Sequence, residues 1–202
     1  MRNADLNHKM RNERREQILS CARRLFAARG LAATKITDIA TAAGMSQGLL
    51  YHYFESKEAI FTEIVREAFV KMNAAARALE ELALPSREKI RMALDQLLRS
   101  IEESEDFANT VLLNAQAGIS DTAPEEAQAI IQAESDVPYA VIARIMRDGQ
   151  RDGSIKPHDA EELAMIFWTT IKGLALHKAV RGAAFKAPDA RILAGMFFTE
   201  ES

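Results

Sequence analysis

The stretch Ile36–Lys57, ITDIATAAGMSQGLLYHYFESK, predicts two short helices joined by a sharp turn. The first helix places three apolar residues on one face at helical spacing: Ile39, Ala40 and Ala43. Gly44 follows, and glycine adopts a positive φ without steric cost, which suits a turn between crossed helices. Ser46 is placed to cap a second helix that begins at Gln47. The pattern predicts a helix-turn-helix unit.

The second helix has the composition of a helix that enters a DNA groove. Its first turn is small and polar, so its N-terminal residues can approach base edges closely. Gly48 costs about 1 kcal/mol relative to alanine inside a helix, so close approach to another molecule explains it better than helix propensity does. Gln47 is the predicted base reader, because its amide can pair with an adenine edge. The candidate DNA-binding residues are Lys35, Thr37, Ser46, Gln47, Gly48, Tyr51, His52, Tyr53 and Lys57.

This motif resembles the signature of the TetR family of bacterial transcriptional regulators. The matching residues are Ile39-Ala40, Ala43-Gly44, Ser46, Gly48, Leu50-Tyr51, Phe54 and Ser56-Lys57. The resemblance covers the first third of the chain. It implies an all-α fold, with an N-terminal three-helix DNA-binding domain and a larger C-terminal helical domain for regulation and dimerisation.

One position departs from the family pattern. Lys35 stands where a capping threonine is common, and Asp38 lies three residues later, where the partner in a capping box would sit. Two interpretations remain open. Either Thr37 caps a helix that begins later, or Lys35 gives up the cap to contact a phosphate.

Charge divides the chain into two parts. The net charge is −3, but residues 1–57 hold ten Lys or Arg against five Asp or Glu, a net +5, which leaves −8 for the remainder. A basic part suits a polyanion and an acidic part does not. We therefore expect a DNA-binding domain over 1–57 and a ligand-binding and dimerisation domain over 58–202. The first dozen or so residues are expected to form a mobile arm, whose Arg2, Lys9 and Arg11 are candidate contacts to DNA.

Several function classes find no support in the sequence. There is no apolar run of membrane-spanning length and no signal-peptide pattern, so we expect a cytoplasmic protein without a membrane partner. The single cysteine, Cys21, has no internal partner and is expected to be a buried, inert thiol. The four histidines lack metal-ligand spacing, and no phosphate-binding loop or nucleophile elbow occurs. We expect no metal, no cofactor and no enzymatic activity.

Apolar periodicity predicts about nine helices and no sheet. Apart from the two in the opening stretch, they span 12–29, 57–82, 86–103, 106–117, 124–152, 160–181 and 189–199. Pro138 removes one backbone hydrogen bond from the 124–152 helix, so a kink is expected near Asp136.

The 160–181 helix is apolar on nearly every side, so it must be covered on more than one side. Together with the last helix it presents more apolar surface than one protomer can cover, which favours self-association. The resemblance implies a homodimer in which these two helices form a four-helix bundle across a two-fold axis. The predicted interface residues are Leu163, Phe167, Thr170, Leu174, Ile192, Met196 and Phe197.

The 106–117 and 160–181 helices mix aromatic and apolar residues with a few polar ones, as the walls of ligand cavities do. The ligand candidates are Phe107, Val111, Asn114, Met146, Trp168 and Lys172, with ordinary core packing as the alternative for each. The 57–82 helix is expected to carry a shift from that cavity to the helix-turn-helix unit.

These observations predict a ligand-responsive DNA-binding regulator. We expect a repressor that binds a palindromic, double-stranded operator as a homodimer and is released by a small-molecule inducer. The alternative is an all-helical dimer of the same fold that binds a ligand or a protein but no DNA.

Overall fold

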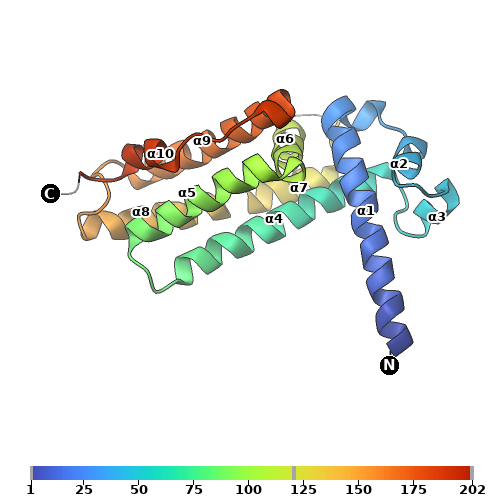
Figure 1. Cartoon of the computed structure of the whole chain (residues 1–202), viewed down its shortest axis with the longest axis horizontal. Helices are drawn as coiled ribbons and strands as arrows, with labels where there is room; N and C mark the ends of the chain where they lie inside the picture. The colour runs from blue at the N-terminus through green and yellow to red at the C-terminus, as the bar shows by residue number, and fades with distance from the viewer. Residues whose placement is uncertain (1, 120–121, 201–202) are drawn as a thin grey trace.

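A computed structural model describes residues 2–119 and 122–200, with side chains described from residue 8 onward except at 119. These residues form ten α-helices and one short 3-10 helix. Figure 1 shows how the α-helices are arranged. The bounds are α1 Arg2–Ala33, α2 Ile36–Ala42, α3 Gln47–Tyr51, α4 Lys57–Glu81, α5 Ser86–Glu103, α6 Glu105–Ile119, α7 Glu125–Glu134, α8 Val137–Arg151, α9 Ala160–Arg181, η1 Gly182–Ala184 and α10 Ala190–Phe197. The predicted all-α fold is confirmed. Within the described residues, β pairing is limited to one antiparallel bridge between Ile155 and Phe198.

One hydrophobic core, here called the N-terminal core, lies among α1, α2, α3 and the first half of α4. Phe26 of α1 and Leu50 of α3 are fully buried in it, and the Phe26 ring contacts Phe61 of α4 edge to face at 5.5 Å. Three residues from later helices complete it: Leu113 and Ala117 of α6 and Ala127 of α7. The N-terminal core therefore depends on helices that the sequence assigns to the other domain.

The second core, here called the C-terminal core, joins the second half of α4 to α5, α8, α9 and α10. These helices run side by side along the long axis of the molecule, while α1, α2 and α3 lie at one end (Figure 1). Phe167 of α9 is fully buried against Trp168 and Phe197. Met72 of α4 packs against both cores. The helix α4 is thus a structural member of both cores, and the domain boundary after residue 57 stays a prediction.

Helix boundaries follow local signals where those signals are strong. Gly30 breaks the helical backbone of α1 with φ 76° and ψ 165°, and Gly44 turns the chain between α2 and α3 with φ 64°. The Asp159 side chain accepts a hydrogen bond from the Glu162 backbone N–H at 2.9 Å and caps α9. These predicted boundaries are confirmed.

The predicted mobile arm is wrong, because α1 already begins at Arg2 and extends beyond the body of the molecule (Figure 1). Its missing periodicity agrees with the exposure of every side chain from residue 8 to residue 14. The segment is nonetheless rich in residues with high helix propensity, including Arg, Glu, Leu and Met. The side chain of Arg2 lies outside the described residues.

The predicted kinked helix is two helices. Helix α7 ends at Glu134 and α8 begins at Val137, with Pro138 in its first turn. The first turn of a helix has no intrahelical acceptor for its N–H groups, so proline is tolerated there at no cost in hydrogen bonding. No helix in residues 2–119 and 122–200 combines the length and hydropathy needed to span a membrane.

Candidate nucleic-acid interface

Helix α3 is short, and its two faces have different roles. Leu50 points into the N-terminal core and is fully buried, whereas Gln47, Gly48 and Tyr51 are exposed. The Ser46 Oγ accepts a hydrogen bond from the Leu49 N–H at 3.2 Å, so its predicted capping role is confirmed. The helix is thereby fixed to the core by one face and presents a polar first turn on the other.

Gly48 has no reason within the protein to be glycine. A Cβ built at this position meets no atom within 4 Å, and its backbone is in the ordinary helical region. Glycine in a helix costs about 1 kcal/mol relative to alanine, and nothing in the protomer compensates for that cost. The absence of a side chain at Gly48 leaves the backbone of α3 open to close approach from outside the protomer.

The other predicted DNA contacts fall into two groups. Lys35 and Thr37 at the start of α2 and His52 at the end of α3 are exposed. Tyr53 is half-buried and packs against the N-terminal core. Within α3, the Gln47 Nε2 donates to the Tyr51 Oη at 3.4 Å, a long and weak hydrogen bond that a nucleic acid could replace.

The open question at Lys35 is settled in part by the start of α2. This helix begins at Ile36, so Thr37 lies inside its first turn and does not cap it. The Asp38 carboxylate accepts a hydrogen bond from the Lys35 backbone N–H at 3.1 Å. A lysine side chain has no acceptor, so only this half of a capping box forms. The Lys35 ammonium is left exposed for another partner.

Lys57 has a structural role that sequence reasoning missed. Its Nζ donates to three backbone carbonyls, those of Leu31 at 2.8 Å, Ala32 at 3.2 Å and Thr34 at 2.9 Å. These are all the donors that an ammonium group has, and the side chain is only 23% exposed. All three donors are thus used within the chain, which corrects the predicted role of Lys57 as a DNA contact: it joins the C-terminal end of α1 to the start of α4, on either side of α2 and α3.

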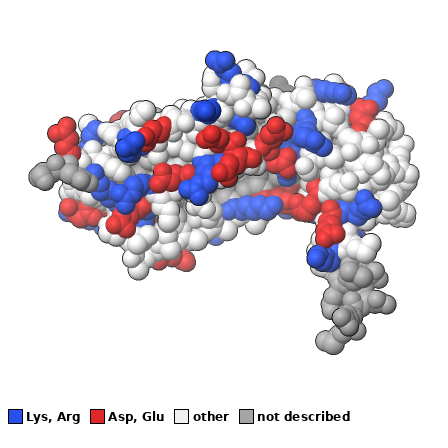
Figure 2. All heavy atoms as spheres, viewed as in Figure 1, with Lys and Arg blue, Asp and Glu red and all other residues white. Residues whose placement is uncertain are grey.

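The basic excess of the first 57 residues is partly neutralised by acids from later helices. Arg15 pairs with Glu63 and Glu67 of α4, and burial works against its ionisation, but these hydrogen bonds and charges prevail and raise its pKa. Arg23 pairs with Asp106 of α6 at 2.6 Å and is only 11% exposed. In the face shown in Figure 2, basic and acidic side chains alternate along the elongated part of the molecule. The charge count alone overstated the basic surface.

Among the described residues, two ion pairs join the α1–α4 unit to α6 and α7. Besides Arg23–Asp106, the Arg66 guanidinium of α4 lies 2.5 Å from the Glu126 carboxylate of α7. Their places match the packing of α6 and α7 into the N-terminal core. A movement of α6 or α7 would therefore be transmitted to the DNA-binding unit.

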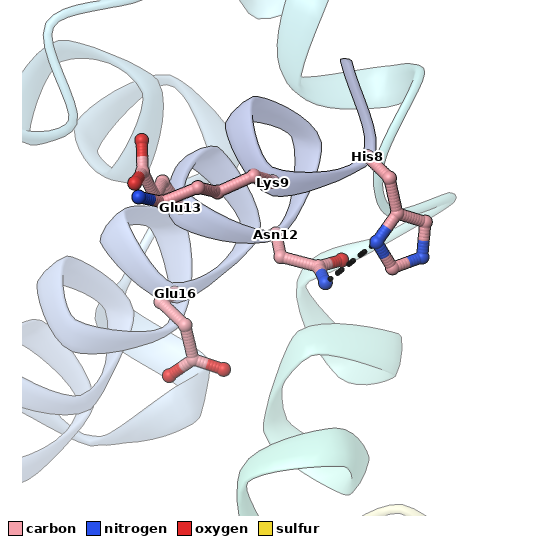
Figure 3. Close-up of a pocket in the computed structure, with 5 residues that line it drawn as sticks. All are labelled: His8, Lys9, Asn12, Glu13 and Glu16. Carbon is pink, nitrogen blue, oxygen red and sulfur yellow. Dashed lines mark hydrogen bonds between the residues drawn. The ribbon is translucent and has the colours of Figure 1, made fainter. Parts of the chain in front are cut away.

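The exposed first part of α1 carries a shallow hollow, drawn in Figure 3. His8 Nδ1 and Asn12 Nδ2 are 3.3 Å apart one helical turn from each other, and Lys9, Glu13 and Glu16 complete the lining. All five side chains belong to one helix, so the hollow is a feature of its surface. The predicted arm contact Lys9 lies here, exposed to solvent.

Most of the ligand candidates are members of the C-terminal core. Met146 is fully buried, and the buried Trp168 donates from Nε1 to the Pro138 carbonyl at 3.0 Å. Phe107 and Val111 of α6 pack against the same core. The Lys172 Nζ, on the exposed side, donates to the Tyr139 Oη at 2.9 Å and lies 4.9 Å from that ring's centroid. The six residues are gathered around α6, α8 and α9, and their role in ligand binding stays a prediction.

Two buried amide oxygens mark a place that core packing does not explain. Asn114 Oδ1 of α6 and Asn73 Oδ1 of α4 accept no hydrogen bond from the described residues. Asn114 was a ligand candidate, but Asn73 was missed. Its signal is an asparagine on the apolar stripe of α4, one turn from both Phe69 and Ala76. Unsatisfied buried acceptors are rare and cost about 1 to 3 kcal/mol each.

The predicted dimer interface is partly wrong. Leu163, Phe167 and Phe197 are buried in their own protomer, and Thr170 and Leu174 are half-buried. Of the predicted set, only Ile192 and Met196 are exposed. The exposed apolar residues of α9 and α10 are Met165, Ile166, Leu176, Val180, Ile192 and Met196. A helix that is apolar all round does not reveal which of its faces turns toward the core of its own protomer.

Known proteins resemble this chain over most of its length. Residues 18–64 match the sequence profile of the family described as bacterial regulatory proteins, tetR family. The transcriptional repressor KstR2 of Rhodococcus jostii is 30% identical over 154 residues, which cover 76% of this chain and 74% of that protein. KstR2 of Mycolicibacterium smegmatis is 28% identical over 144 residues, or 71% of this chain and 68% of that protein.

The fold is shared with solved structures. That of the ketosteroid transcriptional regulator KstR2 of Mycobacterium tuberculosis aligns with a TM-score of 0.74 at 23% identity, covering 93% of this chain and 96% of that chain. The profile match spans the end of α1 through the first part of α4, where the capped α3 and its exposed first turn lie. Together with the Rhodococcus jostii relative, this match confirms the resemblance seen in the sequence. The chain belongs to the tetR family of bacterial regulatory proteins.

Proposed function

We propose that this protein is a cytoplasmic repressor that binds a pseudo-palindromic operator as a homodimer and leaves it when a small molecule binds. The observation that carries DNA binding is the first turn of α3, which is capped, exposed and kept small by a glycine that the protomer does not require. The names of the relatives support repression.

In this proposal, the DNA-facing residues have different roles. Gln47 reads a base edge, while Tyr51, His52 and Lys35 contact phosphates. Ser46 and Lys57 act by holding α3 in place. Tyr53 is half-buried, and we assign its hydroxyl to a phosphate contact as well.

A gel shift on the DNA upstream of the protein's own gene tests operator binding directly. Gln47→Ala should relax the preference for the base at one position of the operator. Lys35→Ala should weaken binding to all DNA sequences alike and reduce the slope of log affinity against log salt by about 0.9. Identical sequence profiles for the two variants would show that the roles are wrongly assigned. An absence of binding to any upstream DNA would favour the alternative of a ligand-binding module without DNA.

The exposed apolar face of α9 and α10 supports a homodimer. Val180 is 79% and Ile192 is 68% exposed, and four further apolar side chains extend the same two helices. Exposed apolar side chains gathered on a helix in this way are a mark of an interface. A two-fold dimer presents two identical α3 helices, so half-sites should lie about one helical turn apart, roughly 34 to 36 Å, or a multiple of that.

Two substitutions separate this face from other exposed apolar residues. Leu176→Glu with Val180→Glu should convert the dimer to a monomer in sedimentation and lower operator affinity by about a hundredfold or more, because avidity is lost. Val70→Glu, at an exposed valine of α4, is the matched control and should remain dimeric. Inserting five base pairs at the operator centre should also abolish tight binding. A dimeric double variant would refute the proposed face.

Regulation would act through α4, which begins beside α3 and belongs to both cores. A ligand shifts the equilibrium only by its difference in affinity for the two conformations. A thousandfold loss of operator affinity requires about 4 kcal/mol of such difference.

A further inference from the structure

The two unsatisfied amide oxygens lie where the two cores meet. Asn73 follows Phe69 of the N-terminal core by one turn of α4 and precedes Ala76 of the C-terminal core. Asn114 follows Leu113, which belongs to the N-terminal core, and Val111, which packs against the C-terminal core. The same junction is spanned by Met72, which touches both cores. Both acceptors therefore belong to helices that meet at this junction, Asn73 to α4 and Asn114 to α6.

The orientation of the Asn73 amide is determined by its neighbour. Its Nδ2 donates to the Glu134 Oε2 at 2.7 Å and to the Glu134 carbonyl at 3.4 Å. A flipped amide would place its oxygen against that carboxylate, so the assignment of oxygen and nitrogen is secure. Asn73 is only 4% exposed, and its Oδ1 consequently faces the interior without a donor from the described residues.

The junction is rich in acceptors and negative potential. Besides the two amide oxygens it has the half-buried Glu134 carboxylate, with which no Lys or Arg of the described part of the chain forms an ion pair. Glu134 is also the last residue of α7, where the helix dipole places partial negative charge. A cation with several N–H donors complements all of these groups.

We propose that this junction, at Asn73, Asn114 and Glu134, binds the protonated amine of an otherwise apolar ligand. This inference rests on the proposed function, since it names the chemical class of the inducer. An ammonium group has three donors and no acceptor, which fits three acceptor groups. A hydroxyl has one donor and no charge, and a carboxylate would face only acceptors.

The site explains how such a ligand would release DNA. Asn73 is on α4, Asn114 is on α6 and Glu134 is on α7, so a ligand between them separates α6 and α7 from α4. Leu113 and Ala117 of α6 are part of the N-terminal core, and separation withdraws them from it. The ligand thus loosens the support of α3 through the helices that complete its core.

Three probes with the same apolar body test the chemistry: 2-phenylethylamine, 2-phenylethanol and 3-phenylpropanoate. Calorimetric titration of the full-length protein should give an affinity for the amine at least tenfold higher than for the alcohol, with the carboxylate weakest. Trp168 is the only tryptophan, and its Nε1 donates a hydrogen bond to the carbonyl of Pro138, four residues after Glu134. Its fluorescence should therefore change when the amine binds. Equal affinities for amine and alcohol would overturn the proposal.

Substitutions locate the binding groups. Asn114→Leu should lower the affinity for the amine at least tenfold. The melting temperature of the ligand-free protein should stay the same or rise, because an apolar group of similar shape replaces an unsatisfied acceptor. Asn109→Leu, at a half-buried asparagine of the same helix, is the matched control and should leave amine affinity unchanged. Glu134→Gln should remove the preference for amine over alcohol. Unchanged amine affinity in both Asn114→Leu and Glu134→Gln would place the site elsewhere.

Operator binding without any probe, measured on the same preparations, separates the two levels of inference. If the protein binds its operator but does not discriminate among the probes, this inference fails and the proposed function stands. If it ranks the probes as expected but binds no operator, the amine site stands and the proposed function fails.

Discussion

The two cores differ in how they are completed. The C-terminal core is built from long helices packed side by side, and it leaves an apolar face of α9 and α10 exposed. The N-terminal core includes two short helices, α2 and α3, and it needs the Lys57 ammonium and residues of α6 and α7 to complete it. The helices that place the DNA-facing residues are therefore the ones that depend on distant parts of the chain. That dependence is what makes the DNA-binding unit open to regulation.

The largest expected effects test whether the two cores are separate. Phe26→Ala in the N-terminal core and Phe167→Ala in the C-terminal core each remove a fully buried ring, and each should lower the free energy of unfolding by about 3 to 5 kcal/mol. Since α4, α6 and α7 join the cores, both variants should still melt in one cooperative transition by calorimetry. Two separate transitions, with only one shifted by each variant, would show that the cores unfold independently.

Lys57 supplies the next largest effect. Lys57→Met keeps the aliphatic stem but leaves three carbonyls without their donor, so the free energy of unfolding should fall by about 1 to 3 kcal/mol. The slope of log operator affinity against log salt should not change, because the ammonium contacts no phosphate. Lys35→Ala is the matched control, with the slope reduced by about 0.9 and stability unchanged. A reduced slope of log operator affinity against log salt in Lys57→Met would show that Lys57 does contact a phosphate.

Sequence reasoning succeeded where a local signal determines a local structure. Gly44 and Ser46 act on the residues beside them, so the turn and the α3 cap follow from the sequence. Lys57 could not be placed in this way, because its three acceptors lie more than twenty residues earlier and meet it only in the folded chain. The partners of Arg15 and Arg23 are even more distant along the chain.

In the C-terminal half, local sequence likewise does not determine which face of a helix is buried. In α9, Leu163 and Met165 are equally apolar in sequence, but only the first is buried in the protomer. Asn73 was detectable as a polar residue on the apolar stripe of α4. Its unsatisfied oxygen depends on where α7 ends, which no local pattern predicts.

Substitution of Gly48 should have a smaller effect, raising the stability of the protein and lowering its affinity for the operator. Gly48→Ala should raise the free energy of unfolding by about 0.5 to 1 kcal/mol, since alanine is the better helix former and a Cβ meets no atom of the protomer. Operator affinity, measured by gel shift, should fall because the added methyl group blocks close approach to the groove. Gly118→Ala is the matched control: its Cβ also meets no atom, and it should leave operator affinity unchanged. Undiminished affinity in Gly48→Ala would mean that the first turn of α3 does not approach DNA closely.

The smallest expected effect concerns the contact between α4 and α8, within the C-terminal core. Arg144 donates two hydrogen bonds to the Glu80 carboxylate, at 2.5 and 2.9 Å, and this holds the pKa of Glu80 below its ordinary value of 4.5. A carboxyl whose pKa is lower in the folded state stabilises the protein above its unfolded pKa, and that stabilisation is lost as pH falls through the folded pKa. Because the pair is partly exposed, Glu80→Gln should lower stability at about pH 7 by at most about 1 kcal/mol. The difference in melting temperature between Glu80→Gln and the unsubstituted protein should therefore shrink as pH falls from about 6 to below about 4. Glu81→Gln, at the exposed neighbouring residue, should show little difference at any pH. A gap for Glu80→Gln that stays constant across this range would mean that the ion pair does not hold α4 against α8, and that apolar packing alone joins the two helices.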